Sequence, residues 1–213
     1  ASAALLGASA APVKTYEVKS PDGRLALVLT AGERLSFTVA RDGETLVAPS
    51  EMALTLSTGE VLGESPRVRS ARRRAVNETI DAPLYRQSRF DAAYNELDLR
   101  LRGDYGVLAR AYDDGVCYRF YTERDGELTI VDETAQLNFE GDPSAYIPYS
   151  KTKIPMRTSF ENTYEYAPLS KFRTQTVAFM PVLVDLGERG YVLYTESDVE
   201  AYSGVYLTYD KEA

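Results

Sequence analysis

The sequence contains no histidine and only one cysteine among its 213 residues. Without histidine, the chain lacks the usual general base of a serine or cysteine triad and the commonest zinc ligand. Cys117 has no second cysteine with which to form a disulfide, and its apolar-rich run GVCYRFY predicts a buried structural thiol. Any chemistry of this chain must therefore rest on carboxylates, tyrosines, lysines or a hard metal ion.

Long apolar runs and positive charge are also scarce. No stretch of about 20 apolar residues occurs, so we expect no membrane span. The chain has 32 acidic and 24 basic residues and a formal net charge of −8. Such a charge argues against a nucleic-acid partner, because phosphates would be repelled, and suits neutral or cationic ligands.

The N-terminal residues 1–13, ASAALLGASAAPV, are small, mostly apolar and uncharged. They resemble the tail of a secretory signal peptide, in which Ala8–Ala10 would fit an A-x-A cleavage pattern. The alternative is a simple N-terminal extension. The first interpretation predicts an exported protein, either periplasmic or associated with the outer membrane.

The rest of the chain, residues 14–213, is dominated by short strand patterns separated by turn residues. Expected strands cover residues 15–20, 25–30, 34–40, 45–50, 52–58, 95–102, 105–112, 116–123, 128–133, 135–139, 176–186, 190–196 and 203–210. Turn residues separate several of them, at 21–23, 41–44, 113–115 and 188–190. This spacing predicts one all-β domain built as a large antiparallel sandwich.

Two segments differ from this regular pattern. Arg72–Arg74 interrupts a stretch without clear periodicity, and in an acidic chain we expect these arginines to lie on the outward face of a strand or loop. Residues 140–173 have no regular period and predict a long irregular connection, which in a compact domain is usually functional or covered by a partner.

The order and spacing of four segments resemble the N-terminal domain of glycoside hydrolase family 97. These segments are YNELDLRL, LARAYDDGVCYRFY, AYIPYSKT followed by ENTYEY, and GYVLYTESDVEAYSGVYL. The resemblance extends from about Lys14 to the end of the chain. It implies a large galactose-mutarotase-like β-super-sandwich, and we expect the chain to stop before the last strands of that domain.

The resemblance also implies a function. In this family the sandwich packs on a catalytic (β/α)8 barrel of the same polypeptide, which hydrolyses α-linked oligosaccharides beside a calcium ion. One calcium ligand comes from the N-terminal domain, and the matching carboxylate in the sequence TYEY is Glu165. The flanking Tyr164 and Tyr166 are then candidate carbohydrate-binding residues, because tyrosine rings stack on sugars and donate hydrogen bonds.

The coordination chemistry of calcium agrees with a ligand that one domain supplies to a site held mainly by another. Calcium takes six to eight oxygen ligands, so one glutamate is too few to form a site alone. Hydrolysis of glycosides ordinarily needs two carboxylates, and the barrel that would carry them is absent from these 213 residues. We therefore expect an inactive domain of an α-glucosidase or α-galactosidase, with no catalytic residue of its own and with an exposed apolar or aromatic patch.

Several alternatives stay open at this point. A stand-alone carbohydrate-binding sandwich would use its tyrosines as a sugar platform, and a structural β-domain of an unrelated secreted protein would need no site. Glu161 and Glu196 are weaker metal-ligand candidates, and Arg119 is expected to pair with a carboxylate. An epimerase of the mutarotase type is disfavoured because it would need a histidine.

Overall fold

The computed structural model describes residues 12–151, 161–197, 199 and 202–208 of the chain. Residues 1–11, including the predicted cleavage pattern, lie outside this description. The regular secondary structure of the described residues is β-strand apart from two short 3₁₀ helices, and the chain divides into two compact units, Ala1–Leu137 and Asn138–Ala213. The all-β prediction is confirmed, and no helix in the described ranges is long and apolar enough to cross a membrane.

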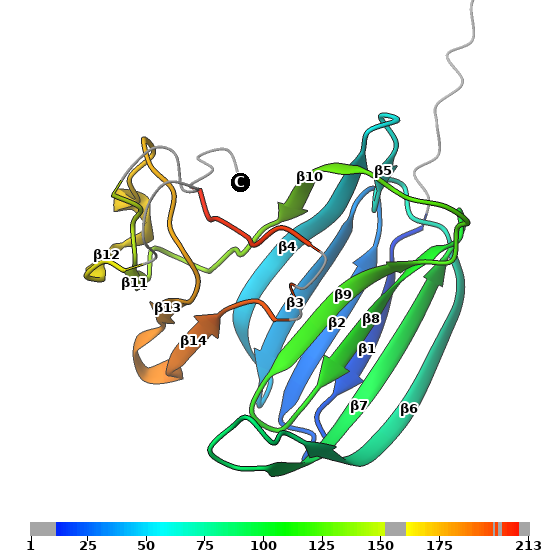
Figure 1. The fold of residues 1–213 in the computed structure, drawn as a ribbon, viewed down its shortest axis with the longest axis horizontal. Helices are drawn as coiled ribbons and strands as arrows, with labels where there is room; N and C mark the ends of the chain where they lie inside the picture. The colour runs from blue at the N-terminus through cyan, green and yellow to red at the C-terminus, as the bar shows by residue number, and fades with distance from the viewer. Residues whose placement is uncertain (1–11, 152–160, 198, 200–201, 209–213) are drawn as a thin grey trace, which may run out of the picture. The chain divides into compact units, whose positions relative to one another are not determined.

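The first unit contains two antiparallel sheets (Figure 1). One sheet has the order β1-β2-β3-β4-β10, with β5 paired to β4. Its strands are β1 (Lys14–Lys19), β2 (Leu25–Ala31), β3 (Leu35–Arg41), β4 (Glu44–Leu56), β5 (Val61–Leu62) and β10 (Ile130–Ala135). The other sheet has the order β6-β7-β8-β9 and contains β6 (Val68–Asp81), β7 (Arg89–Leu101), β8 (Tyr105–Ala111) and β9 (Val116–Thr122).

The core of this unit lies between the two sheets, with β1 and β2 contacting β7 and β8. Alternate residues of the strands point inward, as the period-2 pattern predicted. Leu97 and Leu99 on β7 are fully buried, as are Leu29 on β2 and Val107 on β8. Each such side chain contributes roughly 1.5–3 kcal/mol relative to an exposed position. The ring of Phe37 packs on that of Tyr118 across the core, with centroids 5.2 Å apart.

The turn between β3 and β4 also matches its sequence prediction. Asp42 and Gly43 have φ values of 53° and 87°, and Arg41 pairs with Glu44 in register. Two consecutive residues with positive φ form the tight hairpin turn that suits the twist of antiparallel strands. Aspartate followed by glycine adopts this conformation at low cost, so the turn sets the register of the two strands.

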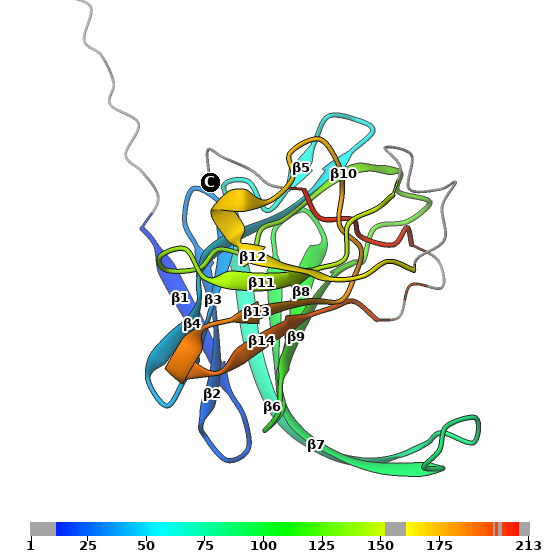
Figure 2. The same cartoon turned by 90° about the vertical axis from the view of Figure 1, so that its left-hand side faces the viewer.

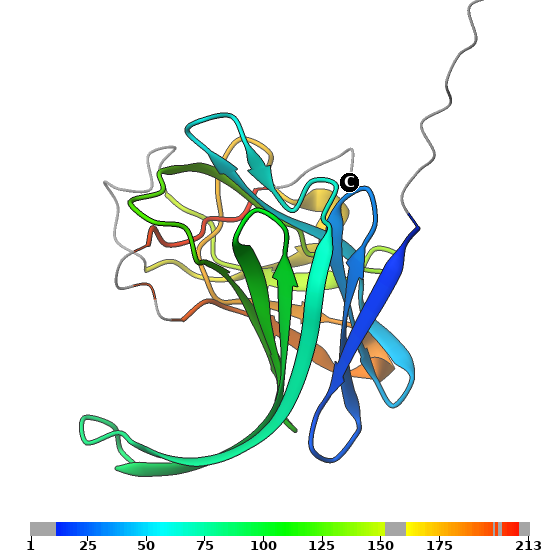
Figure 3. The ribbon, with the colours of Figure 1, turned by 90° about the vertical axis from the view of Figure 1, so that its right-hand side faces the viewer.

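The second half of β6 and the first half of β7 form a long curved arm. Strand β8 pairs with β7 only from Asn95 onward, so residues 76–81 and 89–94 pair with each other alone. Figures 2 and 3 show this hairpin curving away from the remaining strands of the sheet. Its large apolar side chains are exposed, Leu84 by 96% and Tyr85 by 73%.

The second unit has one antiparallel sheet, with strand order β12-β11-β13-β14. The strands are β11 (Ser144–Ile147), β12 (Glu165–Pro168), β13 (Val182–Asp185) and β14 (Tyr191–Tyr194), with 3₁₀ helices η2 (Leu169–Lys171) and η3 (Gly187–Arg189). Ala145, Ile147, Val182 and Val184 are buried on one face of this sheet. Isolated bridges join Tyr149 to Ala178 and Ala178 to Leu207.

The structure can be compared with several expectations drawn from the sequence. Residues 140–173 are not wholly irregular, because β11 and β12 lie within them. The exposed residues Arg72–Arg74 lie on strand β6, which agrees with the expected outward face of a strand or loop, although the sequence pattern did not predict a strand of that length. Cys117 is exposed rather than buried, because its neighbours on β9, Val116 and Tyr118, are the half-buried residues of that alternating strand.

Candidate functional site

Glu165 is the first residue of β12, a strand rather than a loop. It pairs in register with Ile147 on β11, which is fully buried. Successive side chains of a strand point to opposite faces, so Glu165 belongs to the face that carries the core of the second unit. Its position at the end of the strand leaves the side chain 44% exposed.

The carboxylate of Glu165 forms an ion pair with Arg173, in which Nη2 of Arg173 donates to Oε1 of Glu165. The guanidinium of Arg173 also lies over the ring of Tyr149, 5.0 Å from its centroid. The backbone N–H of Arg173 donates to the hydroxyl of Tyr149 over 3.0 Å. Glu165 is thus the outermost member of a cluster that is anchored on one buried tyrosine.

Tyr149 is suited to anchor this cluster, because only 3% of the residue is exposed. Its ring packs edge-on against Phe172, with centroids 5.1 Å apart, and its carbonyl accepts a 2.7 Å hydrogen bond from the side chain of Asn162. Burial raises the pKa of the Tyr149 hydroxyl, and the nearby negative charge of Glu165 adds to that direction. The hydroxyl therefore stays protonated at neutral pH.

Of the two tyrosines that flank Glu165 in sequence, Tyr166 points to the other face of the sheet, and Tyr164 precedes the strand. Tyr166 is 54% exposed, and its hydroxyl donates to Oδ2 of Asp185 over 2.9 Å, a bond that raises the pKa of Tyr166. Tyr164 is 47% exposed, and its hydroxyl lies 3.4 Å from the carbonyl oxygen of Pro181. Glu165 and these tyrosines therefore do not line a common surface within this sheet.

The face that carries Tyr166 is an exposed row of aromatic and aliphatic side chains. Tyr146 pairs with Tyr166 across the strands, and their ring centroids lie 4.6 Å apart. Tyr146 also pairs with Leu183, which pairs with Leu193 on β14. The sequence analysis did not single out Tyr146 or Leu193, because the cross-strand register that aligns them is not visible from sequence. This row matches the expected exposed aromatic patch.

The described residues of the second unit bring together no cluster of metal-ligating side chains. Among the described residues, no group of three or more histidine, cysteine, aspartate or glutamate side chains is placed to bind one. Glu161 is exposed, and Oε1 of Glu196 accepts the backbone N–H of Val205 over 2.8 Å. Glu165 fits calcium only as the donor of one carboxylate, and the other ligands would have to come from elsewhere.

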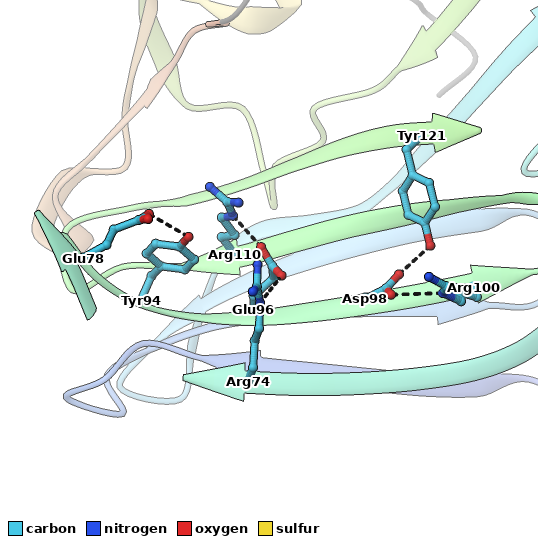
Figure 4. A network of polar contacts seen from close by, with 8 residues as sticks. All are labelled: Arg74, Glu78, Tyr94, Glu96, Asp98, Arg100, Arg110 and Tyr121. Carbon is cyan, nitrogen blue, oxygen red and sulfur yellow. Dashed lines mark hydrogen bonds and ion pairs between the residues drawn. The ribbon is translucent and has the colours of Figure 1, made fainter. Parts of the chain in front are cut away.

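Glu96, the one buried charged residue among those the structure describes, lies on the other unit, on the face of the β6-β7-β8-β9 sheet opposite the core (Figure 4). The Glu96 side chain is only 5% exposed, and it accepts hydrogen bonds from Nε of Arg74 at 2.7 Å and from Nε of Arg110 at 2.8 Å. Burial alone would raise the pKa of Glu96, but the two arginines outweigh it and hold the pKa below 4.5.

Aromatic residues complete this polar network. Arg110 lies 4.6 Å from the ring centroid of Tyr94, whose hydroxyl donates to Glu78 over 2.9 Å. Further along β7, Asp98 accepts a 2.5 Å hydrogen bond from the hydroxyl of Tyr121 on β9. Burial and this hydrogen bond raise the pKa of Tyr121. The network pairs the buried carboxylate of Glu96 with arginines of the same sheet. Its geometry therefore indicates a structural role rather than a ligand site.

Both units, the sandwich and the small second sheet, are built of antiparallel β-strands. The family model described as the glycosyl hydrolase 97 N-terminal domain matches residues 18–213. The chain therefore belongs to the glycosyl hydrolase family 97 N-terminal domain family, and the resemblance noted in the sequence is confirmed.

Known proteins agree with this assignment. The chain is 37% identical over 201 residues to a retaining alpha-galactosidase from Bacteroides thetaiotaomicron, covering 92% of this chain and 30% of that protein. A family 97 enzyme from Pseudoalteromonas sp. strain K8, solved in complex with panose, matches 92% of this chain and 30% of its own, with a TM-score of 0.77 at 17% identity.

A beta-arabinopyranosidase matches with a TM-score of 0.73 at 22% identity, covering 84% of this chain and 31% of its own. At these identities the structural matches support the fold alone. The chain spans about a third of the length of these relatives.

Proposed function

We propose that this domain serves a calcium-dependent α-glycoside hydrolase, in which it lends Glu165 to a calcium ion beside the active site and shapes the access of α-linked oligosaccharides. The catalytic carboxylates would lie in a (β/α)8 barrel of the same polypeptide. The 37% identity to an alpha-galactosidase favours an α-galactoside or a related α-glycoside as substrate. An exported, periplasmic or outer-membrane-associated enzyme would fit the small-residue N-terminus.

The observation that carries the proposal is the presentation of Glu165. Its carboxylate is nearly half exposed, yet Arg173 holds it at one oxygen. Within the described part of the chain, the second oxygen, Oε2, has no hydrogen-bond partner and is available to a cation. Calcium bound in such a site polarises and orients substrate oxygens. The domain's own contribution would be to fill one coordination position of the calcium ion and to fix the direction of that carboxylate ligand.

The test uses the full-length enzyme and the variant Glu165→Gln, which removes the charge and keeps the shape. We expect its hydrolysis of an α-galactoside or α-glucoside to need at least about tenfold more calcium than the wild type. Glu161→Gln is the matched control, because this exposed acid lies only four residues away. Equal calcium dependence in Glu165→Gln and wild type would rule the proposal out.

A second candidate function is carbohydrate binding by the exposed tyrosine face. It is favoured by the neighbouring rings of Tyr146 and Tyr166, which are 37% and 54% exposed, and by Tyr164, which is 47% exposed. Titrating α-linked oligosaccharides should then give a binding signal that Tyr166→Ala removes. Tyr85→Ala, at an exposed tyrosine of the other unit, should leave it intact. Absence of binding at millimolar oligosaccharide would exclude this function.

A further inference from the structure

The arm of β6 and β7, defined here as residues 76–94, carries large apolar side chains toward its end (Figure 3). Ile80 pairs directly with Phe90 across the two strands, so both side chains lie on one face of the arm. Leu84 and Tyr85 follow in the loop that joins the strands. The exposed fractions are 47% for Ile80, 40% for Phe90, 96% for Leu84 and 73% for Tyr85. Apolar side chains gathered in this way on one exposed element mark an interaction surface.

The arm is a preformed element rather than a loose loop. The backbone N–H of Ala82 donates to the carbonyl oxygen of Ser88 over 2.8 Å and closes the loop beyond the last strand pair. Inside this loop, the backbone N–H of Tyr85 donates to the carbonyl oxygen of Ala82 over 3.1 Å. At the base of the loop, Asp81 forms an ion pair with Arg89 at 3.0 Å. A partner can therefore bind the arm without first ordering it, which lowers the entropy cost of docking.

The charges of the arm are few and are paired within it. Residues 76–94 contain three acidic and two basic residues, a net charge of −1 in a chain of −8. Glu78 accepts a hydrogen bond from the hydroxyl of Tyr94 over 2.9 Å, and Asp91 accepts one from the hydroxyl of Thr79 over 2.8 Å. Covering a carboxylate that already has a hydrogen-bond partner costs less than covering a bare one. The arm is therefore suited to contact an apolar surface.

The size of the apolar patch distinguishes between two kinds of partner. Four partly exposed side chains offer on the order of 500 Å². A stable complex of two free proteins buries about 800 Å² on each partner, so the patch is too small to hold a second copy tightly. A partner on the same polypeptide meets the arm at an effective concentration in the millimolar range, and a small patch then suffices. This chain covers 30% of its alpha-galactosidase relative, so most of that relative is available as such a tethered partner.

We propose that the arm docks through Ile80, Leu84, Tyr85 and Phe90 onto an apolar surface of the catalytic part of the same polypeptide. This inference rests on the proposed function only in joining the domain to a catalytic part, and it involves neither Glu165 nor a metal ion. The arm is then buried in the full-length enzyme, although it faces water in the 213-residue chain. Leu84→Ser should therefore be neutral in that chain and change only the full-length enzyme.

The direct test is site-specific photo-crosslinking in the full-length enzyme. Tyr85→p-benzoylphenylalanine places a photoreactive group on the arm, and mass spectrometry identifies the peptides that it captures. We expect a product of monomer mass in which position 85 is linked to a peptide C-terminal to residue 213. Val131→p-benzoylphenylalanine is the matched control, because Val131 is 60% exposed on β10 of the same unit, and it should not capture that peptide. A cross-link between two copies, a cross-link confined to the first 213 residues, or no cross-link would overturn the proposal.

Hydrogen exchange of the full-length enzyme gives a second measurement. Removing the apolar side chains with the double variant Leu84→Ser, Tyr85→Ser should free the arm, so we expect exchange in residues 82–88 to become at least about tenfold faster than in wild type. Val131→Ser should leave exchange in these residues unchanged. Equal exchange in wild type and the double variant would show that nothing covers the arm and would overturn the proposal.

The outcomes separate docking of the arm from the calcium role of Glu165. An intramolecular cross-link from position 85 together with unchanged calcium dependence in Glu165→Gln would overturn the calcium role and support docking. Weakened calcium dependence in Glu165→Gln without that cross-link would overturn docking alone.

Discussion

Glu96 offers the sharpest test of how the first unit is held together. Its carboxylate is 95% buried by side-chain area and accepts one hydrogen bond from each of Arg74 and Arg110. Glu96→Gln keeps the size of the side chain but turns one accepting oxygen into an NH₂ group that faces an arginine. Hydrogen bonds to charged groups contribute about 1.5–3 kcal/mol each, so we expect a loss of about 2–3 kcal/mol.

The assay is thermal unfolding of the purified chain, followed by circular dichroism at pH 7. For a chain of this size, 2–3 kcal/mol corresponds to a fall in Tm of roughly 5–10 °C. Asp81→Asn is the control, because Asp81 pairs with Arg89 at 3.0 Å while both side chains are more than 70% exposed. An exposed pair contributes little, so the control should shift Tm by no more than a degree or two.

The pH dependence of the stability difference between wild type and Glu96→Gln gives an independent check. The pKa of Glu96 is lowered in the folded state from its ordinary value of 4.5. The ionised carboxylate therefore contributes its full stabilisation above about pH 4.5, and this stabilisation is lost as the pH falls through the lowered pKa of the folded state. The stability difference between wild type and Glu96→Gln should therefore be constant from pH 7 to about pH 5 and should shrink in acid. Equal melting of Glu96→Gln and Asp81→Asn at pH 7, or a difference that grows in acid, would refute this account of the network.

Other predictions follow from single positions. A Cβ at Gly106 would lie 2.5 Å from the hydroxyl of Tyr121, so Gly106→Ala should cost about 1–3 kcal/mol in chemical denaturation, and most of this cost should vanish in a Tyr121→Ala background. Leu84→Ser, at a side chain that is 96% exposed on the arm, should leave the free energy of unfolding within about 0.5 kcal/mol of wild type, and a larger loss in denaturant titration would show that the arm is covered. Tyr149→Phe keeps the ring but removes the hydroxyl that binds the Arg173 backbone, so it should cost about 1–3 kcal/mol in thermal unfolding, and an unchanged Tm would argue against Tyr149 as the anchor.

The sandwich was largely predictable because its strands alternate strictly. Leu97, Leu99 and Leu101 are no more than 1% exposed, as their spacing implies, and the Asp42–Gly43 turn has the backbone that its residues favour. The full length of strand β6 was not predicted, because the strand is largely polar and its second half pairs with β7 alone, so it carries no hydrophobic period.

The candidate site was predictable only in part. The family resemblance pointed to Glu165, but the residues that hold it, Tyr149 and Arg173, follow β11 and η2 in the chain, and such tertiary contacts leave no trace in local sequence. Strand β12 has only four residues and owes its place to pairing with β11, so propensity could not reveal it. Once the strand is recognised, alternation alone places Glu165 and Tyr166 on opposite faces.

The central claim is that Glu165 supplies an oxygen to a calcium ion held mainly by the rest of the polypeptide. The most direct measurement is the dissociation constant of calcium for the full-length enzyme and its Glu165→Gln and Glu161→Gln variants, obtained by titration after metal removal. The account predicts binding weakened at least about tenfold in the first variant and unchanged in the second. Identical dissociation constants for wild type and Glu165→Gln would contradict it.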